Sequence, residues 1–284
     1  MTAPAVQNDA HQQPLPGPVD HVLDLIAYGV PFRLAAENAE MLDRMRRQAP
    51  FGSVPSPPHH SGSRQFALRT ALPDATWQVV ADDRLLIDAQ PMAPALVQLG
   101  GHLMSHVAEF APDRVFVHAG VVAWHDRALL LPGVSHAGKS TLVAELVRAG
   151  ATYYSDEFAL LDCQGRVHPF VRDLRMRQPG QRNQTSVSLT QMNGRAGTDA
   201  LTVSMVVFTE YAESARWAPE PMSRGRAVLE TLLHTAPVQR TPARVLETVS
   251  AMMRHATAWR SLRGEAESVA GRLMAALAAG GAPA

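Results

Sequence analysis

The 284-residue chain has little that would bind it to a membrane, to nucleic acid or to itself through a disulfide. Cys163 is its one cysteine, so the chain cannot form an internal disulfide or build a cysteine zinc cage alone. Lysine and arginine total 26, as do aspartate and glutamate, and this balance does not indicate a nucleic-acid or membrane-surface protein. No apolar run is long enough to cross a bilayer.

The two ends of the chain are polar or low in apolar periodicity. The N-terminal segment has no basic stretch followed by an apolar one, so we expect no secretory signal and a soluble, cytoplasmic protein. We expect disordered tails at residues 1–19, which are rich in proline and glutamine, and at residues 279–284. The remaining residues carry enough apolar side chains for a sizeable core, since 46% of the chain is hydrophobic and 18% charged.

Between these tails the patterns predict two domains of an α/β protein. Residues 20–111 carry short β-type runs and an apolar helical run over 92–110, which predicts a small α+β domain. Residues 112–278 begin with two buried-strand runs, at 114–124 and 128–132, and a helix is predicted over 139–149.

The second half of the larger domain has a different pattern. We expect a long mobile loop at 178–200, because this segment is polar and contains glycine, and a strand over 201–208. From about Pro221 onward we expect a helical region, with N-caps at Ser223 and Thr241.

A glycine-rich loop lies between the second strand and the first helix of this domain. Gly133 to Ser140 matches G-x-x-x-x-G-K-[ST], the P-loop pattern, whose backbone N–H groups and helix N-terminus cradle phosphates. Lys139 would reach the β- and γ-phosphates, and the Ser140 hydroxyl would bind Mg²⁺. The alternative is an ordinary glycine-rich turn. The predicted nucleotide-binding residues are Gly133, Ser135, His136, Ala137, Gly138, Lys139, Ser140 and Thr141.

An acidic pair, Asp156-Glu157, ends the strand predicted after the P-loop helix. Parallel strands of a doubly wound sheet end at one edge, where ligands bind. We therefore predict that Asp156 accepts the proton of an attacking hydroxyl, and that Ser140, Asp156 and Glu157 hold Mg²⁺. The alternative is a pair of solvated carboxylates at a strand end.

Three weaker signals accompany these motifs. His118, on an apolar strand, would orient the catalytic carboxylates or simply be a core histidine. Arg175 and Arg177 share one side of a predicted strand, where they would bind phosphate or an acidic substrate, or form a solvated face. His102 and His106 are spaced for a metal pair, but with no supporting motif we interpret them as structural.

Together the motifs VHAG, PGVSHAGKST and YSDE resemble those of the HPr kinase family, bacterial serine kinases with a PEP-carboxykinase-like nucleotide fold. The resemblance covers about Val115 to Val171. It implies catalytic or metal-binding roles for His118, Lys139, Ser140, Asp156 and Glu157. Among these, it implies that Asp156 is the general base.

The chain also departs from the pattern of that family. It has His136-Ala137 where the family usually has Gly-Ile, Thr141 where it has Glu, and Glu157 where it has Asp. The chain therefore resembles a divergent branch of HPr-kinase-related proteins, some of which are associated with ribosomal peptide maturation.

These signals predict a kinase that uses ATP and Mg²⁺ and phosphorylates a serine or other hydroxyl of a protein or peptide acceptor. A ribosomal peptide precursor is one candidate acceptor, and a small molecule is left open. We expect no nucleic-acid or membrane partner and leave a homo-oligomer open. The alternative is a nucleotide-binding regulatory or scaffold module without catalysis. A GTPase and an ABC-type ATPase are less favoured, because the sequence has no N-K-x-D and no L-S-G-G-Q motif.

Overall fold

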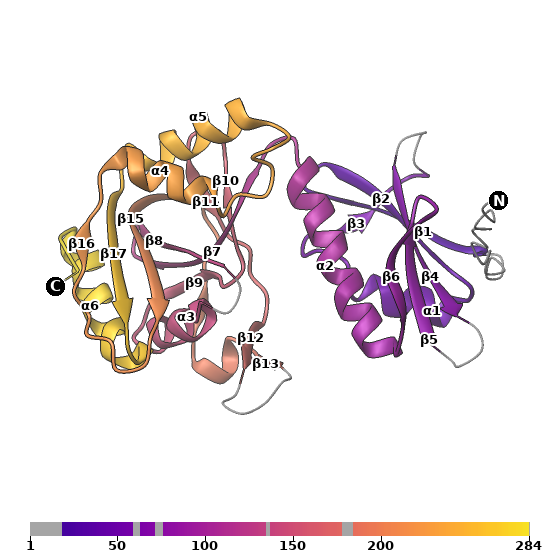
Figure 1. Cartoon of the computed structure of the whole chain (residues 1–284), viewed down its shortest axis with the longest axis horizontal. Helices are drawn as coiled ribbons and strands as arrows, with labels where there is room; N and C mark the ends of the chain where they lie inside the picture. The colour runs from indigo at the N-terminus through magenta and orange to yellow at the C-terminus, as the bar shows by residue number, and fades with distance from the viewer. Residues whose placement is uncertain (1–18, 59–62, 72–75, 135–136, 178–183, 284) are drawn as a thin grey trace, which may run out of the picture. The chain divides into compact units, whose positions relative to one another are not determined.

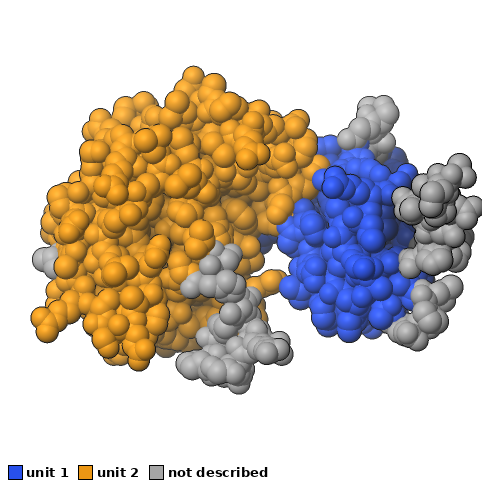
Figure 2. All heavy atoms as spheres, viewed as in Figure 1, with its two compact units in different colours: residues 1–26, 31–103 blue, residues 27–30, 104–284 orange. Residues whose placement is uncertain are grey.

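The computed structural model describes residues 19–58, 63–71, 76–134, 137–177 and 184–283, and the chain forms two compact units (Figures 1 and 2). Unit 1 contains residues 1–26 and 31–103, and unit 2 contains residues 27–30 and 104–284. The boundary thus falls inside helix α2 (Met92–Phe110), earlier than the expected boundary after residue 111. The expected N-terminal tail lies outside the described residues, except for its last position.

Unit 1 is a six-stranded sheet with helix α1 (Ala39–Arg46) and the first part of α2. The strand order is β3 (Val54–Pro55), β1 (His21–Ala27), β2 (Val30–Ala36), β4 (Arg64–Ala71), β5 (Thr76–Ala81) and β6 (Arg84–Gln90). Fully buried Phe32, Phe66 and Leu99 belong to its core. The predicted α+β character and the helix over 92–110 are confirmed, whereas β1 was not predicted.

Unit 2 contains a larger sheet, whose central strand β8 (Arg127–Pro132) pairs with β7 (Val115–Trp124) and with β15 (Leu201–Tyr211). Its other strands are β9 (Thr152–Ser155), β10 (Phe158–Leu161), β11 (Arg166–His168), β14 (Arg195–Ala196), β16 (Glu220–Pro221) and β17 (Thr257–Arg263).

The strands β8, β9, β15 and β17 run in the same direction. β15 is parallel to both β8 and β17, and β9 has the same direction as β8 because both pair antiparallel with β7. The carboxyl ends of β8, β9, β15 and β17 therefore meet at one edge of the sheet, where ligands bind in folds of this kind.

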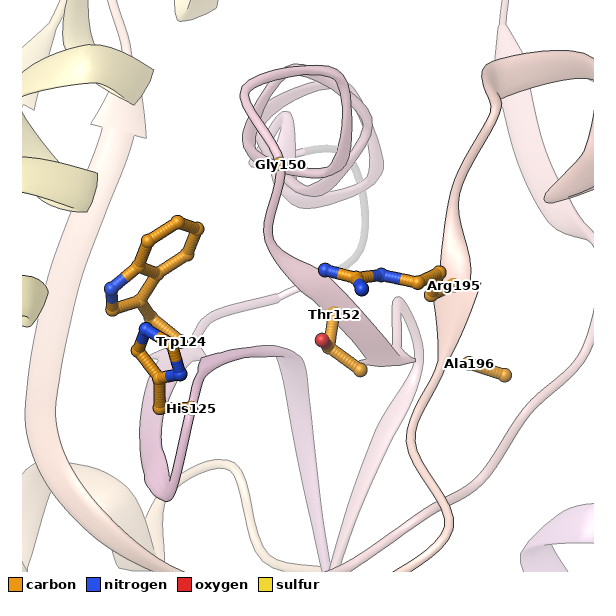
Figure 3. Close-up of a pocket in the computed structure, with 6 residues that line it drawn as sticks. All are labelled: Trp124, His125, Gly150, Thr152, Arg195 and Ala196. Atoms are coloured by element: carbon orange, nitrogen blue, oxygen red, sulfur yellow. The ribbon is translucent and has the colours of Figure 1, made fainter.

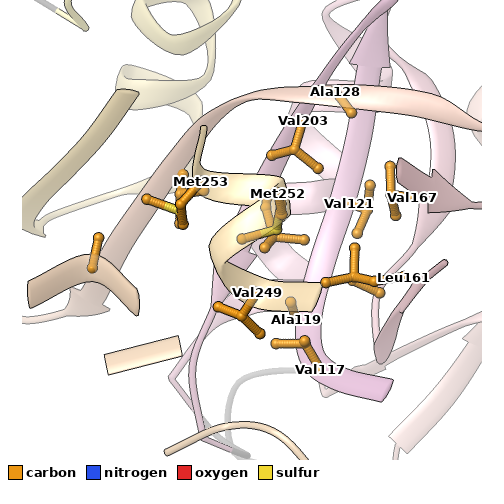
Figure 4. Close-up of a cluster of buried hydrophobic side chains, with 14 of the residues drawn as sticks. Val117, Ala119, Val121, Ala128, Leu161, Val167, Val203, Val249, Met252 and Met253 are labelled. Carbon is orange, nitrogen blue, oxygen red and sulfur yellow. The ribbon is translucent and has the colours of Figure 1, made fainter. Parts of the chain in front are cut away.

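Helices cover both faces of this sheet. One buried cluster joins the sheet to α3 (Lys139–Arg148) and α6 (Ala266–Ala279). Another joins it to α4 (Arg224–Leu232) and α5 (Pro242–Met253), and Figure 4 shows Met252 of α5 against side chains of β7. Successive residues of β7, such as Val121 and Val122, point to opposite faces and belong to different clusters, as expected for a strand buried on both faces. Unit 2 is thus an α/β/α layered structure.

Two sequence expectations for this unit were wrong. The C-terminal region is not wholly helical, because Thr257–Arg263 forms β17, whose residues alternate between buried and more exposed positions. The segment 178–200 is not one long loop in its described part, since Gln184–Val187 forms β13, paired with β12 (Leu174–Arg177). A short 3₁₀ turn at Thr190–Met192 and β14 follow. Pairing overrides a polar local composition, through distant partners for β14 and β17 and through a local hairpin for β13.

The helices of this unit begin and end largely where the capping residues predict. Gly150 follows α3 with φ +100°, and the Ser223 side chain accepts a hydrogen bond from Arg226 N as predicted for an N-cap. Thr241 occupies the N-cap position of α5 but its side chain makes no capping bond. The expected C-terminal tail begins inside α6, and Pro283 is buried and accepts a hydrogen bond from Trp217 Nε1 at 3.3 Å. No helix in the described part of the chain is long and apolar enough to cross a membrane.

Candidate active site

The predicted P-loop lies between β8 and α3, at the carboxyl edge of the sheet. Gly138 is the residue before α3 and has φ +79°, a left-handed conformation that favours glycine. A Cβ atom at this position would lie 2.4 Å from Arg263 Nη2, so a larger residue would also displace this guanidinium. Ser135 and His136, two of the predicted nucleotide-binding residues, lie outside the described residues.

Lys139 is buried and turns back onto the loop that precedes it. Its Nζ donates to the carbonyl oxygens of Gly133 at 2.8 Å and of Val134 at 2.7 Å. Burial lowers the pKa of Lys139 to about 8, and the charges of Asp156 and Glu157 oppose that shift. A phosphate group near Nζ would add an anionic partner to an ammonium group that here hydrogen-bonds only to backbone carbonyl oxygens among the described residues. Thr141, in the first turn of α3, is exposed.

Asp156 brings the acidic pair into contact with the P-loop, as the sequence predicted. Its carboxylate is 4% exposed, and Oδ2 accepts a hydrogen bond from Ser140 Oγ at 2.9 Å. Oδ1 accepts another from the Tyr153 hydroxyl at 3.0 Å. The turn that presents Asp156 is formed by Ser155, whose Oγ accepts from Glu157 N and Phe158 N. The strand end and the helix N-terminus thus meet through a single side-chain hydrogen bond.

Arg172 is the cation that contacts both acids. Its guanidinium forms a close ion pair with Glu157, and its Nε lies 3.5 Å from Asp156 Oδ1. Burial raises the pKa of Glu157, and Arg172 opposes that shift. The side chain of Arg175 is exposed and its charge acts on Glu157, and its backbone N–H donates to Asp156 Oδ2 at 3.4 Å, so its predicted role in binding phosphate or substrate stays a prediction. The side chain of Arg177 lies outside the described residues.

His118 lies at the same sheet edge but contacts the loop side of the site. It stands opposite Phe158 in the β7–β10 pair, and no hydrogen bond joins its ring to Asp156 or Glu157 in the described part of the chain. Its pKa is lowered to about 4, mainly by burial and next by the charge of Lys139, while a hydrogen bond with the Gly133 backbone opposes the shift. The expectation that His118 orients the carboxylates is therefore replaced by a contact with the P-loop backbone.

The oxygen ligands at this edge suit a hard divalent cation that arrives with a nucleotide. Among the described residues, no group of three or more His, Cys, Asp or Glu side chains is arranged to hold a metal ion by itself. Mg²⁺ in phosphoryl-transfer sites is usually held by one or two carboxylates together with phosphate oxygens. Ser140 Oγ and Asp156 Oδ2 are oxygen atoms of the kind that Mg²⁺ prefers, and they lie within hydrogen-bonding distance of each other.

Arg263 is the site residue that the sequence analysis missed. It ends β17, is 2% exposed, and donates from Nη2 to the Gly138 carbonyl oxygen at 2.8 Å and from Nη1 to the Gly264 carbonyl oxygen at 2.9 Å. Its guanidinium also lies over the Tyr211 ring. No local signal could have identified it, because Arg263 and Gly138 are 125 residues apart in the chain. Tyr153 was also missed, but its place three residues before Asp156 was a usable clue.

A separate cavity lies beyond the other end of α3 and contains none of the predicted site residues. It has a volume of about 320 Å³ and is lined by Trp124, His125, Gly150, Thr152, Arg195 and Ala196 (Figure 3). The side chains of Trp124, at the end of β7, of the next residue, His125, and of Arg195, in β14, lie around it.

Comparison with known proteins gives no relative from which a function could be transferred, so the functional assignment rests on the residues of the site. No protein-family model matches the chain, and no curated protein matches it.

Proposed function

We propose that this protein is a kinase that uses ATP and Mg²⁺ to phosphorylate a hydroxyl group of a protein or peptide, as in the HPr kinase family that its motifs resemble. The observation that carries this proposal is the contact between the P-loop and the acidic pair, in which Ser140 Oγ donates to Asp156 Oδ2 at 2.9 Å. This contact brings Ser140, Asp156 and the N-terminus of α3 together at one sheet edge, which supports the proposed roles of Ser140 as a Mg²⁺ ligand and Asp156 as the base.

Each group has a role in the proposed reaction. Loop backbone and Lys139 bind the phosphates, and Arg172 stabilises negative charge on the transferred group. Ser140 and Asp156 would hold Mg²⁺, which would supply further stabilisation of the charge on the phosphates. The acceptor oxygen forms a bond to the γ-phosphorus as the bond to the ADP oxygen breaks, and Asp156 accepts the acceptor's proton.

Asp156→Asn tests this proposal because it keeps the shape of the side chain and removes the base. We expect transfer to fall by about a hundredfold or more, the usual scale for loss of a general base, while nucleotide binding survives. Single-turnover transfer from γ-labelled ATP to candidate peptide and protein acceptors measures the first, and calorimetric titration measures the second. A wild-type rate in Asp156→Asn would show that this carboxylate is not the base.

The alternative is a nucleotide-binding regulatory or scaffold module, and one observation favours it. Arg172 pairs with Glu157 and approaches Asp156, so both acids already have a cationic neighbour without any nucleotide. A binding module would bind ATP in both wild type and Asp156→Asn and would transfer phosphate to no acceptor in either.

A further inference from the structure

A second hollow lies at the same sheet edge, on the side of the P-loop away from the acidic pair. It has a volume of about 500 Å³. Its walls are the start of the P-loop, the carboxyl ends of β15 and β17, and the end of α4. None of Ser140, Asp156, Glu157 or Arg172 lines it. The P-loop thus has the acids on the β9 side and this hollow on the β15–β17 side.

The rim of the hollow is apolar and open to solvent. Val134 of the loop, Leu262 of β17 and Leu233 at the end of α4 all line it, and they are 59%, 55% and 81% exposed. Large aliphatic side chains that are exposed around one hollow indicate a binding site for the apolar part of a ligand.

Polar groups lie among these apolar ones. Thr209 also lines the hollow, is only 9% exposed, and its hydroxyl has no hydrogen-bond partner among the described residues. Glu210, beside it, forms no salt bridge within the described residues, whereas Glu230 is paired with Arg260. A buried hydroxyl without a partner costs free energy, and a ligand that bonds to it recovers that cost.

In-line phosphoryl transfer decides which part of the substrate belongs here. The attacking oxygen and the leaving oxygen lie on opposite sides of the transferred phosphorus. If the acceptor hydroxyl approaches from Asp156, the nucleoside must leave the P-loop on the other side, toward the hollow. A purine nucleoside also has the matching chemistry, with apolar ring faces for the three aliphatic side chains and edge donors and acceptors for Thr209 and Glu210.

We infer that this hollow, between the P-loop and the carboxyl ends of β15 and β17, is the site for the purine nucleoside of the triphosphate. The inference rests on the proposed function and adds to it the binding surface for the half of the nucleotide that the P-loop motif does not describe.

The test compares ATP with inorganic tripolyphosphate, which has the phosphates but no nucleoside, in the presence of Mg²⁺. The double variant Leu233→Asn, Leu262→Asn makes the rim polar without adding charge, and both residues are exposed, so the fold is retained. Its matched control is Leu229→Asn, Leu246→Asn, which changes two exposed leucines that do not line the hollow. Calorimetric titration of full-length protein gives each affinity.

We expect wild type and control to bind ATP more tightly than tripolyphosphate. In the rim variant ATP affinity falls by about tenfold, the effect of losing contact with two apolar side chains, and tripolyphosphate affinity stays the same. Unchanged ATP affinity in the rim variant would overturn the nucleoside site while the P-loop assignment stands, and would point to the acceptor as the occupant. A wild type that binds neither ligand would overturn both proposals.

Discussion

At the scale of single residues, the site depends on side chains that reach across the sheet edge. Asp156 is contacted by Ser140 from α3, by Tyr153 from its own strand and by Arg172 from the segment that follows β11. Each contact comes from a different part of the chain, so a change at one residue affects the geometry of the others. This coupling makes conservative substitutions more informative than truncations.

Arg263→Lys is such a substitution, because it keeps the charge and removes the planar fork. One ammonium group cannot reach the carbonyl oxygens of both Gly138 and Gly264 in the geometry of the guanidinium. We expect a loss of about 1–3 kcal/mol in the free energy of unfolding, from a buried carbonyl left without its donor, and weaker ATP binding. Urea denaturation and ATP titration measure the two effects.

The control for this variant is Arg254→Lys, at an exposed position that ends α5. It should leave both quantities unchanged. ATP affinity equal to wild type in Arg263→Lys would mean that Arg263 supports the fold but not the loop conformation needed for binding.

His118 gives the protein a pH-dependent stability. Its pKa falls from the ordinary 6.5 to about 4 in the folded state, so between these values the unfolded state binds the proton more readily. The free energy of unfolding should therefore decrease as pH falls from about 6.5 toward 4. In His118→Gln the free energy of unfolding should depend less steeply on pH, and the change in slope corresponds to at most one proton bound on unfolding. Urea denaturation at several pH values across that range measures the slope. His255→Gln removes an exposed imidazole as control, and equal slopes in His118→Gln and wild type would contradict the assignment.

At the scale of elements, the close packing of α3 on β7 holds Lys139 and Ser140 at the sheet edge. Gly120 lies in the middle of β7, and a Cβ atom there would lie 2.6 Å from Val143 Cγ2 of α3. The glycine thus allows the helix to approach the strand, and any bulk added at this point must move the helix that carries the P-loop residues.

Gly120→Ala should therefore lower both stability and nucleotide affinity. Overpacking a core contact typically costs about 1–3 kcal/mol, measured by chemical denaturation. Val143→Ala removes the clashing methyl group, so the double variant Gly120→Ala, Val143→Ala should recover part of the lost ATP affinity. A double-mutant cycle with no coupling between the two positions would show that α3 is not displaced.

The sequence predicted elements well where the signal was local. The helix over 92–110, the hairpin of β7 and β8, and α3 all follow from apolar runs, glycine and helix caps. β17 was missed because its short polar-containing segment becomes a strand through pairing with the distant β15. The strand that carries Arg175 and Arg177 was predicted as β12, but its hairpin partner β13 was missed because that segment is polar. Arg263 was missed with β17, since its role depends on the strand that carries it.

At the scale of the whole molecule, the candidate site belongs to one of the two units. Every residue that contacts Asp156 or lines the proposed nucleoside site lies within residues 104–284. A ligand bound there should stabilise unit 2 directly, because a ligand that binds only the folded state adds its binding free energy to folding.

Hydrogen exchange with and without Mg·ATP tests this. We expect a higher melting temperature overall and slower exchange in α3 and at the carboxyl ends of β15 and β17, with little change in β4, β5 and β6 of unit 1. Lys139→Ala should weaken or abolish both effects. The same slowing across β4 to β6 would show that nucleotide binding also reaches unit 1, contrary to this prediction.

The sequence by itself determined the order strand, glycine loop and helix around Lys139, and the acidic pair at the end of the next parallel strand. These features depend on neighbouring residues, whose spacing is visible in the chain. Only the tertiary structure decided that Arg172 rather than Arg175 contacts both acids, that Arg263 supports Gly138, and that an apolar hollow lies beside the loop. The physical reason is that the sheet brings the carboxyl ends of β8, β9, β15 and β17 to one edge, and strand order is set by long-range pairing and burial, which local pattern does not specify.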